Sequence, residues 1–104
     1  MAQVRHDSDK LAALMKAGQD GDKRAYAQLL AEIAPIVRRV IRRERPFIDK
    51  EDVEDIVQDV LISVHSVRQT YDPERPFLPW LIAIARNRMI DSGRRHVRRA
   101  AHEV

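Results

Sequence analysis

The sequence predicts an all-α fold, a compact bundle of about four helices in a single domain spanning 1–104. Apolar residues recur at spacings of three and four along nearly the whole chain, which is the pattern of amphipathic helices. The composition agrees, with 44% hydrophobic residues, 34% charged residues and only three glycines. A chain of 104 residues has enough apolar surface for one modest core.

The first predicted helix is short and spans 9–17. Ser8 precedes it and is expected to accept a hydrogen bond as its N-cap, and Gly18 is expected to end it in a left-handed conformation. Its apolar stripe consists of Leu11, Leu14 and Met15. The segment "GQDGD" that follows is typical of a turn.

The second and longest predicted helix spans 23–44, after an N-cap at Asp22. Pro35 lies inside this range and is expected to bend the helix without ending it. One continuous apolar face predicts that this helix lies at the centre of the bundle. The residues of this face are Tyr26, Leu29, Leu30, Ile33, Val37, Val40 and Ile41.

The third predicted helix spans 50–67, begins after an Asp49 cap and has two different faces. Its apolar face consists of Val53, Ile56, Val57, Val60, Leu61 and Val64. Its outward face presents carboxylates and an amide around one aliphatic side chain, namely Asp52, Asp55, Gln58, Asp59 and Ile62. This pattern suits a docking site for a basic helix, and it also suits an ordinary solubilising surface.

A proline-punctuated loop over 69–77 leads into a fourth predicted helix over 78–92, with Pro79 in its first turn. The segment "WLIAIA" is apolar all round and should be buried, whereas the chain is mostly polar and basic from Arg86 onward. A basic extension follows over 93–99. Gly93 leaves open whether the helix continues through it.

Charge is strongly segregated along the chain. The segment 51–67 has a local charge of −5, whereas 38–45 and 86–99 have local charges of +4 and +5. An acidic segment between two basic ones indicates separate surfaces for separate partners, with the basic segments as candidate phosphate contacts. Solvated helix faces would give the same pattern.

Composition and spacing argue against several function classes. The four histidines form no short-spaced ligand set, and no glycine-rich phosphate loop or nucleophile and base grouping is present, so we expect neither an enzyme nor a cofactor or metal site. The sequence lacks an apolar run long enough to span a membrane and a signal-peptide pattern at its start. We therefore expect no membrane insertion and a cytoplasmic location.

Two motifs together carry a resemblance to a known family. The segment "DVEDIVQDVLISV" followed by "RPFLPWLIAIARNRMID" and an arginine cluster resembles region 2 of the extracytoplasmic-function (ECF) group of sigma factors, in the sigma-70 family. The resemblance covers roughly residues 8–99. It implies a helical domain that binds the clamp helices of the RNA polymerase β′ subunit and opens the minus-ten promoter element. The region 4 helix-turn-helix of such proteins is not found in this sequence, which suggests a fragment of a longer protein or a member that works without it.

The resemblance also implies roles for individual residues. The polymerase contacts correspond to Asp55, Gln58 and Asp59, flanked by Asp52 and Ile62. The loop that captures an unstacked base of the non-template strand corresponds to Tyr71, Asp72, Arg75 and Phe77. Trp80 matches an aromatic residue associated with strand opening. A tryptophan at the start of an apolar helix usually packs in the core, and this role is favoured for Trp80 and for Phe77. Contacts to the minus-ten bases and phosphates correspond to Arg86, Asn87, Arg88, Arg94 and Arg95.

Two other interpretations stay open. A helical adaptor that binds only protein predicts that the arginines are solvated and that single-stranded promoter DNA does not bind. A non-specific DNA-binding domain predicts duplex binding that depends strongly on salt and little on sequence.

The resemblance further implies an anti-sigma factor as a partner.

Overall fold

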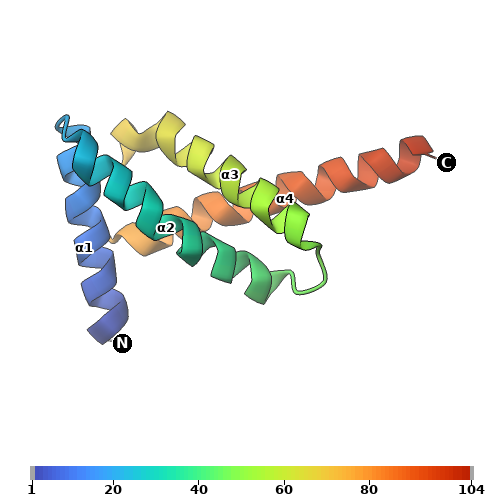
Figure 1. The fold of residues 1–104 in the computed structure, drawn as a ribbon, viewed down its shortest axis with the longest axis horizontal. Coiled ribbons are helices and arrows are strands. Elements are labelled where there is room, and N and C mark those ends of the chain that lie inside the picture. Colours follow the sequence, from blue (N-terminus) through green and yellow to red (C-terminus); the bar gives the residue numbers. More distant parts are fainter. Residues whose placement is uncertain (1, 104) are drawn as a thin grey trace.

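Four α-helices and one short 3₁₀ turn form the domain in the computed structural model (Figure 1), which describes the backbone of residues 2–103 and the side chains of residues 7–95. The elements in chain order are α1 (Ala2–Gln19), α2 (Lys23–Glu44), α3 (Lys50–Val67), η1 (Arg68–Thr70) and α4 (Phe77–Glu103). The described residues contain no β-strand. The predicted all-α fold is therefore confirmed.

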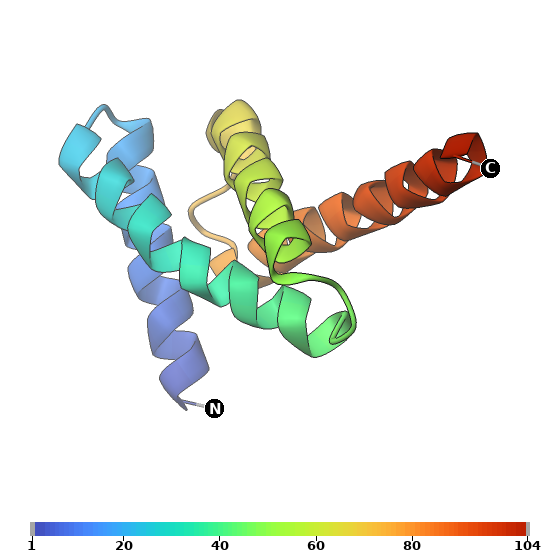
Figure 2. The same cartoon turned by 45° about the vertical axis from the view of Figure 1, so that its right-hand side comes forward.

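The helices α1 and α2 form an antiparallel pair, α3 packs beside α2, and α4 contacts all three. Figures 1 and 2 show the C-terminal half of α4 extending past the ends of the other helices. This arrangement buries Phe77, Leu81 and Ala85 at the start of α4, whereas Arg94 and Arg95 further along the helix are exposed. The end of the basic extension, including the side chains of Arg98 and Arg99, lies outside the described side chains.

The core contains apolar side chains from every helix, on the faces that the spacing of three and four predicts. Tyr71, in the loop before α4, closes one end of it. Burying these side chains supplies the main driving force for folding, at about 25 cal/mol per Å² of apolar surface. The buried apolar residues are Leu11, Met15, Leu29, Ile33, Val37, Ile41, Val53, Ile56, Val57, Val60, Val64, Tyr71, Phe77, Leu81, Ala85 and Met89.

The α1–α2 turn differs from the prediction in its glycines. Gly18 lies inside α1, and the residue with positive φ is Gly21, at +103°. A Cβ atom at Gly18 would lie 3.0 Å from Cδ1 of Tyr26, so this glycine allows α1 and α2 to approach each other closely. The Asp22 cap is confirmed, because its Oδ1 accepts a hydrogen bond from the backbone N of Ala25 at 3.0 Å.

Ser8 has a different role from the one predicted. It lies inside α1, which begins at Ala2, and its buried Oγ accepts hydrogen bonds from the backbone N of Phe77 at 2.9 Å and of Leu78 at 3.2 Å. The residue directly before α4 is Pro76, which has no side-chain oxygen to cap the helix. A serine from the first helix therefore caps the last one.

Replacing Ser8 with alanine is expected to lower the free energy of unfolding by about 1–2 kcal/mol, because two N–H groups at the start of α4 lose their acceptor in a buried place. Urea denaturation followed by circular dichroism measures this change. Ser66→Ala is a matched control, since Ser66 is exposed and its Oγ donates only to the carbonyl of Ile62 within its own helix. Equal effects of the two substitutions would contradict the capping role of Ser8.

The helices α2 and α3 are joined by a charged pair. Nε and Nη2 of Arg38 donate to the two carboxylate oxygens of Glu54 at 2.7 and 2.8 Å.

The α2 helix continues through Pro35. The expected Asp49 cap uses its backbone alone, since its carbonyl accepts from the N of Val53 at 3.0 Å and its side chain makes no capping hydrogen bond.

The fourth helix is longer at both ends than the predicted 78–92. It begins at Phe77 and continues through Gly93 to Glu103. Gly93 costs a helix interior about 1 kcal/mol relative to alanine, but the arginines and alanines that follow are good helix formers. The predicted basic extension is thus a continuation of α4.

Candidate interaction surfaces

The acidic surface of α3 consists of the five predicted residues Asp52, Asp55, Gln58, Asp59 and Ile62. They lie on the side of α3 opposite its buried residues, with Asp55 and Gln58 exposed and Asp52 and Asp59 partly buried. Ile62 is 63% exposed. The four polar members line a cavity of about 220 Å³ together with Ile56, Ser92 and Arg95. The structure therefore brings the predicted polymerase contacts together on one face.

One ion pair joins this acidic surface to α4. Nη2 of Arg95 donates to Oδ2 of Asp59 at 2.8 Å. The hydrogen bond to Asp59, followed by its charge, raises the pKa of Arg95 above the ordinary value for arginine. The family resemblance implies polymerase as the partner of Asp59 and DNA as the partner of Arg95. The contact between the two residues was therefore not predicted.

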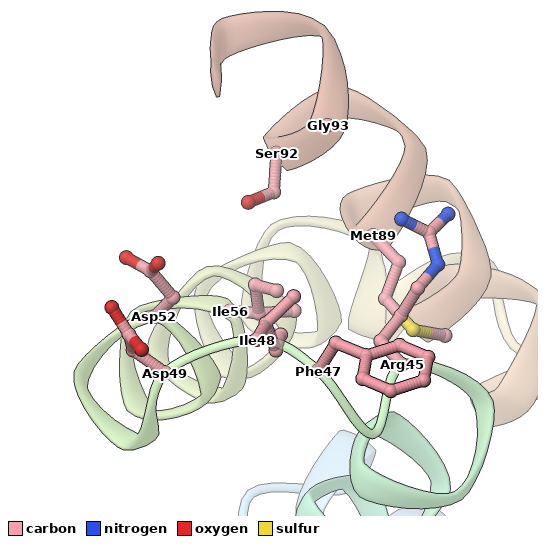
Figure 3. Close-up of a pocket in the computed structure, with 9 residues that line it drawn as sticks. All are labelled: Arg45, Phe47, Ile48, Asp49, Asp52, Ile56, Met89, Ser92 and Gly93. Atoms are coloured by element: carbon pink, nitrogen blue, oxygen red, sulfur yellow. The ribbon is translucent and has the colours of Figure 1, made fainter. Parts of the chain in front are cut away.

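A cavity of about 360 Å³ lies where the α2–α3 loop meets α4, and its lining residues are drawn in Figure 3. Ile48, Ile56 and Met89 give it apolar walls, and Asp49 and Asp52 stand at one side of it. Phe47 lies at its edge with 96% of its surface exposed. Phe47 was not predicted as a site residue. The available signal was an aromatic residue after Arg45 and Pro46, between the second and third predicted helices.

The predicted base-capture loop has a buried part. Tyr71 is 3% exposed and Phe77 is fully buried, and their ring centroids lie 5.3 Å apart in an edge-to-face contact. The hydroxyl of Tyr71 donates to the carbonyl of Arg75, while Nε2 of Gln19 donates to the carbonyls of Arg68 and Tyr71, both at 2.8 Å. The expected base contacts of Tyr71 and Phe77 are therefore corrected, because both rings pack in the core and have no open face for a base. For Phe77 the structure agrees with the alternative role of core packing.

Asp72 and Arg75, in the same loop, are both exposed. Oδ1 of Asp72 accepts from the backbone N of Glu74 at 2.9 Å, and its carbonyl accepts from the backbone N of Arg75 at 2.9 Å. The side chain of Arg75 is 80% exposed. A tight turn thus holds one carboxylate and one guanidinium out toward solvent.

Trp80 lies between the core and the surface. Its ring packs 5.0 Å from Tyr71 and 5.5 Å from Phe77, measured between centroids, and it is partly buried. The structure therefore gives Trp80 a packing role and leaves part of the side chain open to a ligand.

The predicted nucleic-acid contacts on α4 differ in how they are paired. Nε of Arg86 donates to both carboxylate oxygens of Glu44, at 3.0 and 3.2 Å. Arg88 lies 3.5 Å from Asp91, and its Nε is buried without a hydrogen-bond partner. Asn87 and Arg94 are exposed. Arg88, Arg94 and Arg95 line a cavity of about 380 Å³ with two aspartates, Asp59 and Asp91.

Within the described residues, no group of acidic or histidine side chains is arranged to hold a metal ion. The described helices also include none that is both long and apolar enough to cross a membrane.

These features define a class of protein, a helical domain with an acidic surface next to a polar and basic one. The sigma-70 region 2 family matches residues 29–99. The ECF RNA polymerase sigma factor SigF of Caulobacter vibrioides is 42% identical over 86 residues, which cover 83% of this chain and 48% of SigF. The RNA polymerase sigma factor CnrH of Cupriavidus metallidurans is 35% identical over 85 residues, covering 82% of this chain and 42% of CnrH.

A solved structure is similar in fold as well as in sequence. An engineered region 2 of sigmaE in complex with GTAAAA, determined by NMR, has a TM-score of 0.68 and 28% identity, and the match covers 82% of this chain and 90% of that one. The chain belongs to the sigma-70 family, as a region 2 domain of the ECF group. It spans about half the length of the relatives it matches.

Proposed function

We propose that this domain is the part of a transcription initiation factor that binds core RNA polymerase and then recognises and melts the minus-ten promoter element. The observation that carries the proposal is the placement of an exposed acidic surface on α3 beside an exposed polar and basic surface on α4. Two surfaces of opposite character on adjacent helices suit simultaneous binding of a basic protein helix and a nucleic acid.

The acidic surface of α3 is the proposed contact for the clamp helices of the β′ subunit. Carboxylates such as Asp55 and Asp59 pair with arginines through charge-assisted, often bidentate hydrogen bonds. Ile62 provides an exposed apolar group beside them, and an apolar contact surrounded by charged ones is typical of protein interfaces. Asp59 would exchange its present partner, Arg95, for an arginine of the polymerase.

The α4 surface and the exposed turn before it are the proposed DNA contacts. Asn87 has the amide chemistry for a bidentate contact to adenine, and Arg94 has the charge for a phosphate contact. Asp72 and Arg75 are exposed and can bond to the edge of an unstacked non-template base, for which Trp80 offers a partly open ring. Three further arginines would contact phosphates in place of the carboxylates that they pair with in the free domain, namely Arg86, Arg88 and Arg95. The sigmaE region 2 complex with GTAAAA supports a short nucleic acid as the ligand.

An anti-sigma factor that covers one or both surfaces is the further partner we propose, on the family resemblance alone. Because such a partner would compete with polymerase or DNA, the two surfaces described above are also its expected targets.

The experiment that tests the function combines polymerase binding with DNA selection. The chain is mixed with bacterial core polymerase, and the complex is isolated and used to select sequences from a pool of single-stranded oligonucleotides with a randomised stretch. A promoter carrying the selected sequence is then tested for strand opening. Failure to bind core polymerase would contradict the proposal, and polymerase binding without any DNA selection or opening would favour the adaptor interpretation.

Asn87→Ala is expected to weaken binding of the polymerase complex to the selected oligonucleotide by at least about fivefold, because one bidentate base contact is worth about 1–3 kcal/mol. The affinity for a scrambled oligonucleotide should change by less than about twofold, since phosphate contacts remain. Fluorescence anisotropy measures both. Gln28→Ala is the control, because it removes an exposed amide on α2. Equal losses on both oligonucleotides would show that Asn87 does not read a base.

A further inference from the structure

The exposed side of α4 contains an aliphatic residue, Ile90, that has no role in the proposed function so far. Its side chain is 47% exposed, although the buried side of the same helix offers apolar contacts through Leu81, Ala85 and Met89. A single exposed isoleucine is common on protein surfaces and needs no explanation by itself. The position of Ile90 among the residues around it is what carries the inference.

Ile90 lies on a stripe of exposed residues that runs along α4 on the side opposite the core. The stripe consists of residues at spacings of four, three and four, which lie above one another on one helix face: Ala83, Asn87, Ile90 and Arg94. All four are exposed. Ile90 is thus one turn from the amide of Asn87 on one side and one turn from the guanidinium of Arg94 on the other.

Ion pairs border this stripe on both sides. Toward α2, Nε of Arg86 donates to Oε1 of Glu44 at 3.0 Å. Toward α3, Nη2 of Arg95 donates to Oδ2 of Asp59 at 2.8 Å. The groups between these borders are the ones that a ligand lying along α4 would meet first. Along that path, Ile90 is an apolar group placed between a hydrogen-bonding group and a cationic group.

We propose that Ile90 is a specificity-determining residue that contacts the 5-methyl group of a thymine next to the base contacted by Asn87. The inference rests on the proposed function, because it requires DNA to lie along α4. The 5-methyl group of thymine is the apolar group that a base edge offers to an aliphatic side chain. Three residues of α-helix advance by about 4.5 Å and successive nucleotides of a stacked strand by about 3.4 Å, so side chains one turn apart can reach neighbouring nucleotides.

The test uses a change of one methyl group in the DNA. The oligonucleotide selected by the polymerase complex is resynthesised with deoxyuridine in place of each thymine in turn, which removes the methyl group and keeps all hydrogen-bonding groups. With the unmodified chain, one such replacement is expected to weaken binding about fourfold, the ratio for burying one methyl group. With Ile90→Ala, the same replacement should have no effect. Ile90→Val keeps a branched aliphatic group and should retain most of the fourfold effect.

The matched control is Val67→Ala, which shortens an aliphatic side chain of α3 that is 37% exposed and lies away from the stripe. It should leave the fourfold effect unchanged. If no thymine replacement affects the unmodified chain, if no thymine is selected, or if Ile90→Ala keeps the full methyl effect, the role of Ile90 is overturned while the proposed function stands. If Ile90→Ala lowers polymerase binding and leaves the methyl effect intact, Ile90 contacts protein and the inference is likewise overturned. If the complex selects no DNA sequence, both the inference and the proposed function fail.

Discussion

Replacing Phe77 with alanine is expected to lower the free energy of unfolding by about 3–5 kcal/mol. The Phe77 ring is fully buried and packs against Tyr71 and Trp80 at the first residue of α4. Alanine would remove most of this apolar surface and leave a cavity between α1, the loop and α4. Because a domain of this size is stabilised by only about 5–15 kcal/mol in total, the loss would be a large fraction of its stability.

The chain provides its own control for this substitution, since its other phenylalanine is Phe47, which is 96% exposed. Phe47→Ala should change the free energy of unfolding by no more than about 0.5 kcal/mol. Guanidinium chloride denaturation followed by circular dichroism measures both variants. If Phe77→Ala has no folded baseline, Phe77→Leu gives a measurable intermediate loss. Equal stability of the Phe77→Ala and Phe47→Ala variants would contradict the packing described above.

Reversing the charge of Asp55 is expected to weaken binding to core RNA polymerase by at least about tenfold, a change of about 1.4 kcal/mol or more. Asp55 is exposed on α3, so Asp55→Arg would place a positive charge where the proposed function requires pairing with arginines of the clamp helices. Arginine is also a good helix former, so α3 should stay intact. Quantitative pull-down or surface plasmon resonance with core polymerase measures the affinity.

Asp59→Arg should weaken polymerase binding as well, but it also removes the ion pair with Arg95, so Asp55→Arg is the cleaner variant. Asp20→Arg makes the same change of charge in the α1–α2 turn, outside the acidic surface of α3, and should bind polymerase normally. Thermal unfolding of all three variants checks that they remain folded. Normal polymerase binding by both α3 variants would rule out the acidic surface as the contact.

The helices and their buried faces could be predicted from the sequence because each depends on local spacing. The apolar stripe of α2 and the two-faced pattern of α3 need only the period of the helix to be recognised. The exposure of Asp55, Gln58 and Ile62 followed from the same period, since it places them opposite Val57 and Val60. The outward face of α3 was therefore predictable from the sequence, whereas its assignment to polymerase depends on the family resemblance.

Two features that sequence reasoning missed depend on contacts between distant segments. Whether Tyr71 lies inside or outside depends on how the loop crosses the end of α1, where Gln19 holds its backbone. The contact between Asp59 and Arg95 depends on the packing of α3 against α4. Helical periodicity contains no information on either, so one aromatic residue was assigned to the wrong environment and one ion pair was not foreseen.

The hydrogen bonds from α4 to Ser8 have a consequence for the order in which the domain assembles. They join residues 69 and 70 positions apart, whereas the contacts between α1 and α2 are much more local. Contacts of long sequence separation require closure of a large loop, which makes them late events in folding. During synthesis on the ribosome, the α1–α2 pair can form early, while α4 gains its cap only after Phe77 and Leu78 have emerged.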